Sequence, residues 1–201
     1  MKRMNRMMML LICLVASVSL SAQGLSGKDE KAINAQVKRF LGFMEAKNYS
    51  GTADLIYPKL FEHTPKDQLF QIFNLMEQAG IDLKFNDLKV TNMKALPQDE
   101  GIDYALIKFS MNLELPLNTD ELKGYAALMV PMLQGNFGKE NVDYNKKESY
   151  IKVTGERFLL GVNDPEYKEW LFLIYDDTFK SEIAKTIPAK INQAAAAATN
   201  E

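Results

Sequence analysis

The chain has 201 residues, of which 47% are hydrophobic and 25% are charged, and its formal net charge is −2 at pH 7. This composition is ordinary for a globular protein, and the length predicts one domain of usual size. A mildly acidic chain without a basic cluster is a poor match for nucleic acid or for an anionic membrane surface, so we expect neither as a partner.

Residues 1–22 have the pattern of a secretory signal peptide. Three basic residues precede an apolar run over residues 7–18, and small residues follow it at a candidate cleavage site. The run is too short for a comfortable membrane span, and the residues before Cys13 are too large for a lipid-attachment site. We therefore expect an exported chain, periplasmic or secreted, that begins near Gln23 and has no cysteine, disulfide or membrane span. Its formal charge is −5, because three basic and no acidic residues are removed.

Three helices are predicted first. Residues 27–47 place apolar side chains at spacings of three and four, with acidic residues in the first turn. Residues 49–57 form one or two further turns. The third helix starts with Thr64 as its cap and Pro65 at the first helical position, and Gly80 is placed to end it.

The spacing of apolar residues then changes to alternation, which predicts strands. Residues 81–90 form a bent strand, a turn lies at 97–101, and a long strand places alternate apolar residues over 105–115. This alternation indicates an antiparallel sheet with one buried face and one wet or partly covered face. Helical spacing returns over 118–134 and inserts a helix between strands, with Pro131 expected to kink or end it.

The centre of the sheet is predicted to be a pair of long strands within residues 150–177. Its second strand carries the only tryptophan, Trp170, in an apolar run that suits a strand covered on both faces. Between the two strands, Asn163, Asp164 and Pro165 have the composition of a tight turn, because Asn and Asp bond their own backbone and Pro sets the bend.

The C-terminal region is expected to contain a helix over residues 178–187 and, over 194–201, an alanine-rich flexible tail. The predicted organisation is thus a signal peptide in residues 1–22, one α+β domain in residues 23–193, and this tail.

Three segments carry a resemblance to a known family: VKRFLGFMEAKNYSGTADLIYPKLF at residues 37–61, WLFLIYDD at residues 170–177, and the dipeptide at residues 187–188. They are similar to the nuclear-transport-factor-two-like family, the cystatin-like cone, and in particular to exported bacterial members without a known activity. The resemblance covers most of residues 30–192. It implies helices packed on a curved antiparallel sheet that forms a cone, although the inserted helix departs from the simplest family pattern. Some members hold small ligands in the cone, a few catalyse reactions, and many dimerise through the sheet.

No catalytic constellation is visible in the sequence. The single histidine, His63, lies before the third predicted helix without a visible partner, whereas enzymes of the family place an acid and a histidine inside the cone. Asp176 and Asp177 would point to opposite faces of a strand, and they fit better as a strand end that caps the helix at Thr178. We therefore expect no catalytic residue, metal site or cofactor.

Aromatic and methionine side chains are the candidates for a ligand pocket, although such residues on central strands are more often plain core. The candidate lining residues are Phe109, Met111, Tyr125, Met129, Phe158, Trp170 and Phe172.

We expect an exported, non-catalytic binding or interaction module that holds a small apolar ligand or a protein partner, with a homodimer through the sheet as its mode of self-association. The alternative is a small hydrolase or isomerase with a carboxylate base in the cone, which a buried carboxylate of raised pKa would support. A third possibility is a structural or adhesion component of the envelope, which a large exposed apolar patch would support.

Overall fold

The fold is described from a computed structural model, over residues 24–78 and 80–199. The signal peptide predicted for residues 1–22 lies outside this range. The described chain is an α+β protein with six α-helices and an open, five-stranded antiparallel sheet, as the sequence predicts. None of its helices combines the length and the apolar character that crossing a membrane requires.

The helical elements are, in chain order, α2 (Gly27–Glu45), α3 (Tyr49–Asp54), the 3-10 turn η1 (Pro58–Glu62), α4 (Lys66–Gln78), α5 (Asp120–Phe137), η2 (Lys139–Asn141), η3 (Asp177–Phe179), α6 (Lys180–Thr186) and α7 (Ala189–Ala198). The strands are β1 (Lys84–Asp99), β2 (Ile102–Pro116), β3 (Val142–Asn145), β4 (Tyr150–Asn163) and β5 (Leu171–Tyr175).

Side-chain caps fix several helix starts. The Asp29 N–H donates to the Ser26 hydroxyl at the start of α2, and the Gly51 N–H donates to the Asn48 side chain at the start of α3. Helix α4 begins at Lys66, one residue later than predicted. Gly80 follows α4 with φ of 68°, the left-handed conformation expected of a helix-ending glycine.

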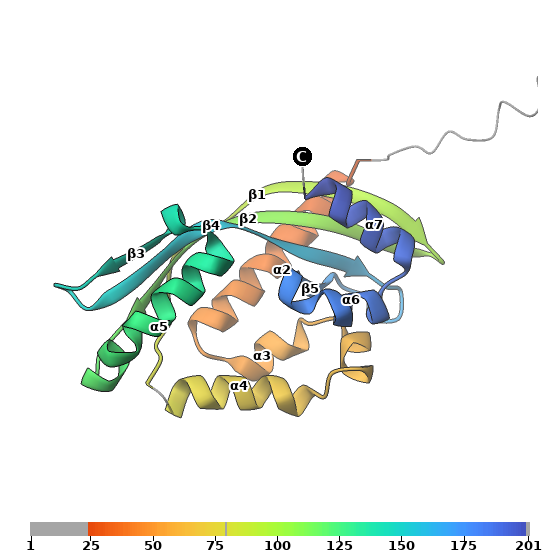
Figure 1. The fold of residues 1–201 in the computed structure, drawn as a ribbon. Helices are drawn as coiled ribbons and strands as arrows, with labels where there is room; N and C mark the ends of the chain where they lie inside the picture. Colours follow the sequence, from red (N-terminus) through yellow and green to blue (C-terminus); the bar gives the residue numbers. More distant parts are fainter. Residues whose placement is uncertain (1–23, 79, 200–201) are drawn as a thin grey trace, which may run out of the picture.

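The sheet has the order β1-β2-β4-β3, and β5 also pairs with β4. Strands β3 and β5 therefore share one edge of β4, because β2 pairs with its other edge along the whole length. Irregular register in β1, first between Phe85 and Asp87, accounts for the predicted bend in this strand. The long strands arch over α2, α3, α4 and α5 (Figure 1).

The inner, concave face of the sheet is covered by two separate helical layers. Phe40 of α2 packs edge-to-face on Phe172 of β5, with ring centroids 6.1 Å apart. At the far end of the sheet, Leu122 and Ala126 of α5 belong to a second hydrophobic cluster that includes Ile151 of β4. The concave face thus has two cores, one under α2 and one under α5.

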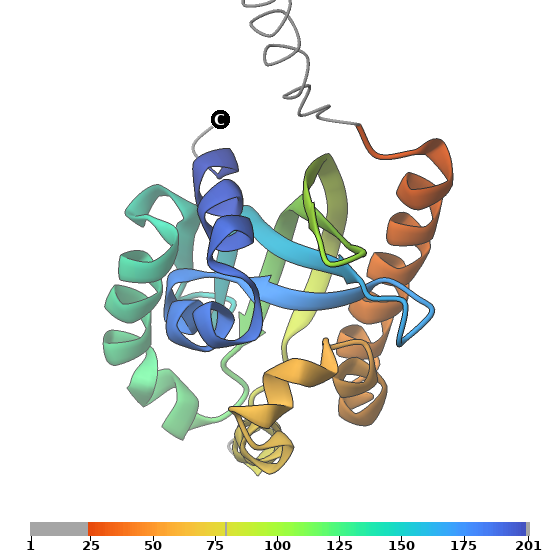
Figure 2. The same cartoon turned by 90° about the vertical axis from the view of Figure 1, so that its right-hand side faces the viewer.

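The outer face of the sheet is partly covered, as the alternation along β2 predicts. Tyr104 and Leu106 point away from the concave face, yet only 3% and 4% of their surfaces are exposed. Helix α7 packs on this side of β1 and β2, opposite α2 (Figure 2). Further along β2, Ser110 and Glu114 on the same outer face are only partly buried.

At the helices, the structure corrects the expectation of a flexible tail and excludes one of the two effects expected of Pro131, the end of the helix. Residues 194–198, expected as a flexible tail, form the second half of α7, and Ala195 is fully buried because its small side chain fits against the sheet. Pro131 lies inside α5 without ending it, and the helix runs on to Phe137. Pro131 is exposed, so water can bond the backbone carbonyl that loses its helical N–H donor.

Candidate functional site

The candidate site lies where the edge of β4 is interrupted. Strand β3 pairs with residues 150–153 of β4 and β5 pairs with residues 158–162 on the same edge. Within the described chain, residues 154–157 have no partner strand on that edge, and we call this gap the notch. The end of α5 borders the notch on one side, and the end of β5 with η3 borders it on the other.

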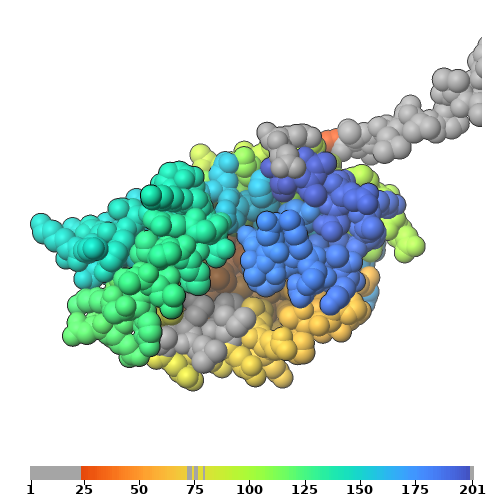
Figure 3. Space-filling model, in the orientation of Figure 1, coloured from red at the N-terminus to blue at the C-terminus, as the bar shows by residue number. Residues whose placement is uncertain are grey.

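A pocket of about 860 Å³ runs from the concave face through the notch to the end of α7 on the outer face, where Ala196 and Thr199 line it. Its floor is formed by the middle of the sheet, between the two cores, and α2 closes its back. Figure 3 shows the hollow between α5, in green, and the blue η3–α6 region. The apolar residues that line it include Phe40, Met44, Phe85, Leu88, Phe109, Met111, Leu159 and Ile174.

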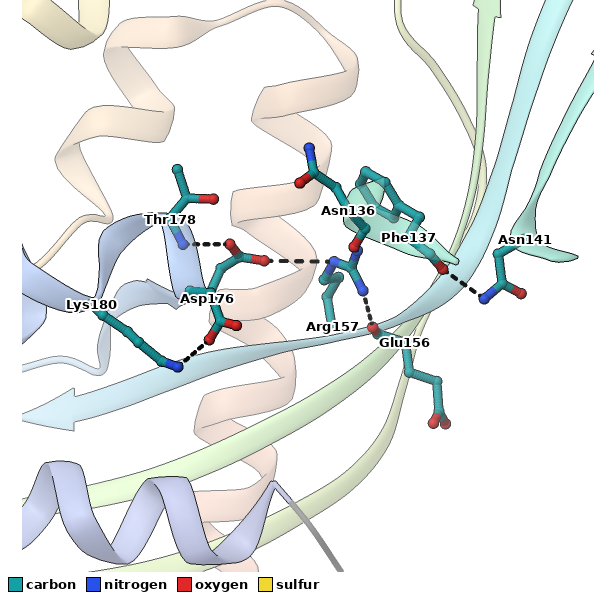
Figure 4. Close-up of polar contacts among 9 residues, drawn as sticks. Asn136, Phe137, Asn141, Glu156, Arg157, Asp176, Thr178 and Lys180 are labelled. Atoms are coloured by element: carbon teal, nitrogen blue, oxygen red, sulfur yellow. Dashed lines mark hydrogen bonds and ion pairs between the residues drawn. The ribbon is translucent and has the colours of Figure 1, made fainter. Parts of the chain in front are cut away.

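Arg157 is the charged residue at the centre of this site. It lies on the concave face of β4, directly opposite Phe109 in the β2–β4 pairing. Its guanidinium stacks on the ring of Phe137, 4.0 Å from the centroid, and donates to the backbone carbonyls of Glu156 and Asn136 at 2.9 Å and 2.8 Å (Figure 4). Burial lowers the pKa of Arg157 from its usual value, and the nearby carboxylate of Asp176 opposes that effect.

The end of α5 holds Phe137 in place over Arg157. Gly138 ends the helix with φ of 90°, a conformation that favours glycine, and its N–H bonds back to the Gln134 carbonyl. The side chain of Asn141 then donates to the Phe137 carbonyl at 2.8 Å. This local turn gives the aromatic ring a fixed position beside the notch.

Asp176 is the acidic group of the site. It follows β5 and caps η3 by accepting the Thr178 N–H at 2.9 Å, which confirms the prediction of a strand-ending cap. The nearest approach of its carboxylate to Nε of Arg157 is 3.8 Å, a loose ion pair. Burial raises the pKa of Asp176, but the Thr178 hydrogen bonds and Arg157 outweigh burial and hold this pKa below its usual value.

The neighbouring charges are paired elsewhere. Asp177 binds Lys180 at 2.5 Å and is largely exposed. Glu156 points to the outer face and pairs with Lys108 at 2.7 Å. Glu156, Asp177 and Lys180 also line the pocket, but each has a close ion-pair partner, whereas Arg157 and Asp176 are paired only loosely with each other.

The predicted lining residues divide into three groups. Phe109 and Met111 line the pocket as expected, and Phe158 borders it at the notch from the outer face. Trp170 and Phe172 are 3% and 1% exposed and belong to the core under α2.

Helix α5 contributes less to the pocket than its sequence pattern predicts. Met129 packs against the core under α5. Tyr125 lies on the outer side of the helix and is 51% exposed, together with Leu128 at 71% and Met132 at 56%. The helix is apolar on more than one side, so its pattern does not reveal which side faces the sheet.

Arg157 was missed as a site residue, although the sequence contains a signal for it. In β4, Ile151, Val153, Gly155, Arg157 and Leu159 share the concave face. A charged residue in such an apolar series is unusual unless a partner or a ligand accompanies it. Its partners at the end of α5 and β5 are distant in sequence and were not predictable.

A second polar cluster lies at the turn after β4. The Asp164 carboxylate accepts hydrogen bonds from the Tyr57 hydroxyl at 2.7 Å, from Lys59 at 3.1 Å and from the Glu166 N–H at 3.0 Å. Burial raises the pKa of Asp164, but these three donors outweigh it and the net pKa is lowered. The predicted turn is present. Its aspartate is also buried, and its hydrogen bonds join the turn to Tyr57 and Lys59, which are distant in sequence.

His63 is exposed at the end of η1 and is not among the residues that line the pocket. Within residues 24–78 and 80–199, no group of three His, Cys, Asp or Glu side chains is placed to hold a metal ion. The fold and this geometry define the class, an α+β protein with a mainly apolar pocket and a partly buried arginine at its edge. Comparison of the sequence with family models and with characterised proteins gives no match.

Proposed function

We propose that the protein is an exported, non-catalytic binding module that holds a small, largely apolar ligand on the concave face of its sheet. The observation that carries the proposal is the pocket of about 860 Å³ between the two cores. Its volume falls within the range of roughly 300–1,000 Å³ that is typical of sites for small ligands, and its walls are mainly apolar. The open, curved sheet also supports the proposed relation to the nuclear-transport-factor-two-like family.

The enzymatic alternative has less support from the electrostatics of the site. A general base working near neutral pH benefits from a raised carboxylate pKa. The inward carboxylate, Asp176, has a lowered pKa because it accepts the Thr178 N–H and lies near Arg157. Such a group stays charged and is a weak base at neutral pH.

Self-association through the sheet is also less favoured than ligand binding. Part of the outer face is occupied by α7, and another part carries polar and charged side chains such as the Lys108–Glu156 pair. Contact with a protein partner has one observation in its favour, the exposed apolar stripe of Tyr125, Leu128 and Met132 on α5.

Native mass spectrometry of the protein purified from its own host tests the proposal. We expect a reproducible added mass of a few hundred daltons, lost on denaturation. Met111→Trp places a large side chain in the pocket and should abolish the adduct, whereas Tyr125→Ala on the outer side of α5 should retain it. Absence of any adduct, with a clean dimer instead, would contradict the proposal and favour a protein partner.

A further inference from the structure

We propose that the ligand is an amphiphile with a single carboxylate head group, which Arg157 binds at the notch while the apolar part lies over Phe109 and Met111. This inference rests on the proposed function and adds the chemical class of the ligand. It follows from the placement of one partly buried arginine at the border between an apolar pocket and the surface.

The contacts of Arg157 with the described residues fix its guanidinium in place but leave some of its N–H groups without a hydrogen bond, so these can bind an anion. Two of its five N–H groups donate to the carbonyls of Glu156 and Asn136, and Phe137 covers one side of its plane. Within the described chain, the other three N–H groups make no hydrogen bond. A planar guanidinium with free N–H groups is suited to a carboxylate, which it binds through two parallel hydrogen bonds.

Asp176 neutralises Arg157 only loosely. Their closest atoms are 3.8 Å apart, beyond the 2.7–2.9 Å of a charge-assisted hydrogen bond, and Asp176 also holds the Thr178 N–H. The arginine side chain is 24% exposed, so it can be reached from the notch. A ligand carboxylate would therefore pair with a partly buried cation that the protein leaves incompletely paired.

The apolar part of the ligand has a defined path from this head group. Phe109 faces Arg157 across the β2–β4 pairing, and Met111 faces Gly155, which has no side chain. A Cβ atom added to Gly155 would meet no atom within 4 Å, so the concave face is open at this point. An alkyl or ring system bound at Arg157 can extend over these residues toward α2.

Titration calorimetry with dodecanoate and dodecan-1-ol, both below their aggregation limits, tests the assignment on the full mature chain. The two probes share an apolar chain and differ in the carboxylate. We expect dodecanoate to bind more tightly than the alcohol. Arg157→Gln should weaken dodecanoate by roughly 10- to 100-fold, the range expected for a charged hydrogen bond, and leave the alcohol nearly unchanged.

Two further variants serve as controls. Arg39→Gln removes another arginine that lies beside an aromatic ring and an acid, Phe43 and Glu169, but outside the pocket, and it should change neither affinity. Asp176→Asn keeps a side-chain oxygen for the Thr178 N–H and removes the competing charge, so dodecanoate affinity should rise about threefold. This variant tests the assignment even where Arg157→Gln folds poorly.

The outcomes separate the two proposals. Equal binding of both probes, unaffected by Arg157→Gln and Asp176→Asn, would overturn the carboxylate head group and leave the apolar pocket as the binding site. Failure of both probes to bind the unmodified chain would overturn the pocket as a binding site, and the head-group assignment with it.

Discussion

Two glycines on the same strand and the same face show that the concave face is filled under α2, which we call the filled half, and open between the two cores, which we call the hollow half. A Cβ atom added to Gly161 would lie 3.1 Å from the Ile107 side chain and 3.2 Å from Trp170. Added to Gly155, it would meet nothing within 4 Å. The first glycine allows large side chains to pack closely, whereas the second lies beside the pocket. The same residue type therefore serves packing in one half and leaves space in the other.

The polar groups of the two halves also differ: the one in the filled half is closely hydrogen-bonded, and the two in the hollow half are paired only loosely with each other. Asp164, in the filled half, is 5% exposed, and three donors lie within 3.1 Å of its two oxygens. Arg157 and Asp176, in the hollow half, are 3.8 Å apart. A fully satisfied group of this kind stabilises the fold, while an incompletely paired one can exchange its partner for a ligand.

The largest effect is expected in the filled half. Trp170→Ala should lower the free energy of unfolding by about 3–5 kcal/mol, because it removes a buried indole and leaves a cavity beside Gly161. Urea denaturation followed by circular dichroism measures the change. Tyr125→Ala, at a position that is 51% exposed, is the matched control and should change stability by about 0.5 kcal/mol or less. Equal effects of the two substitutions on stability would contradict the tight packing of Trp170 in the filled half.

Asp164→Ala should lower stability by about 2–3 kcal/mol at pH 7, because the buried Tyr57 hydroxyl loses its acceptor. The pKa of Asp164 is lowered in the folded state, so its charged form stabilises the fold. Its contribution is complete above the ordinary value of 3.8 and is lost as the pH falls through the folded-state pKa. The difference in free energy of unfolding between the unmodified chain and the Asp164→Ala variant should therefore be constant from pH 7 to about pH 5 and shrink below pH 4.

Asp177→Ala is the control for that titration. Asp177 is 87% exposed, and its removal should have little effect at any of these pH values. A difference in stability between the Asp164→Ala variant and the unmodified chain that stays constant down to pH 2 would mean that the charge of Asp164 has no part in it. That result would contradict the prediction that the charged, hydrogen-bonded form of Asp164 stabilises the fold.

The sequence predicts the strands and helices of this fold better than it predicts the site, for a physical reason. Alternation along β2 and the helical stripe of α2 are local properties of the chain. The notch depends on β3 and β5 sharing one edge of β4, and this pairing between distant segments leaves no local pattern. Helix α7 was missed because small alanines do not form a strong hydrophobic stripe, although they suit close packing on a sheet.

The smallest change in stability is expected in the hollow half, and a matched pair on β2 tests it. Ile107 and Met111 lie on the same face of this strand, but Ile107 is fully buried whereas Met111 lines the pocket. Ile107→Trp should lower the free energy of unfolding by about 1–3 kcal/mol, because overpacking displaces its neighbours. Met111→Trp should change it by less than about 1 kcal/mol, because the added ring enters open space next to Gly155.

Thermal and urea denaturation of both variants, with dodecanoate titration of Met111→Trp, measure the contrast. Reduced ligand binding together with nearly unchanged stability would place the open volume of the pocket beside Met111. A large loss of stability in Met111→Trp would instead mean that this half is packed as tightly as the half at Ile107. The comparison between the two glycines of β4 would then fail as well, because Gly155 would no longer border free space.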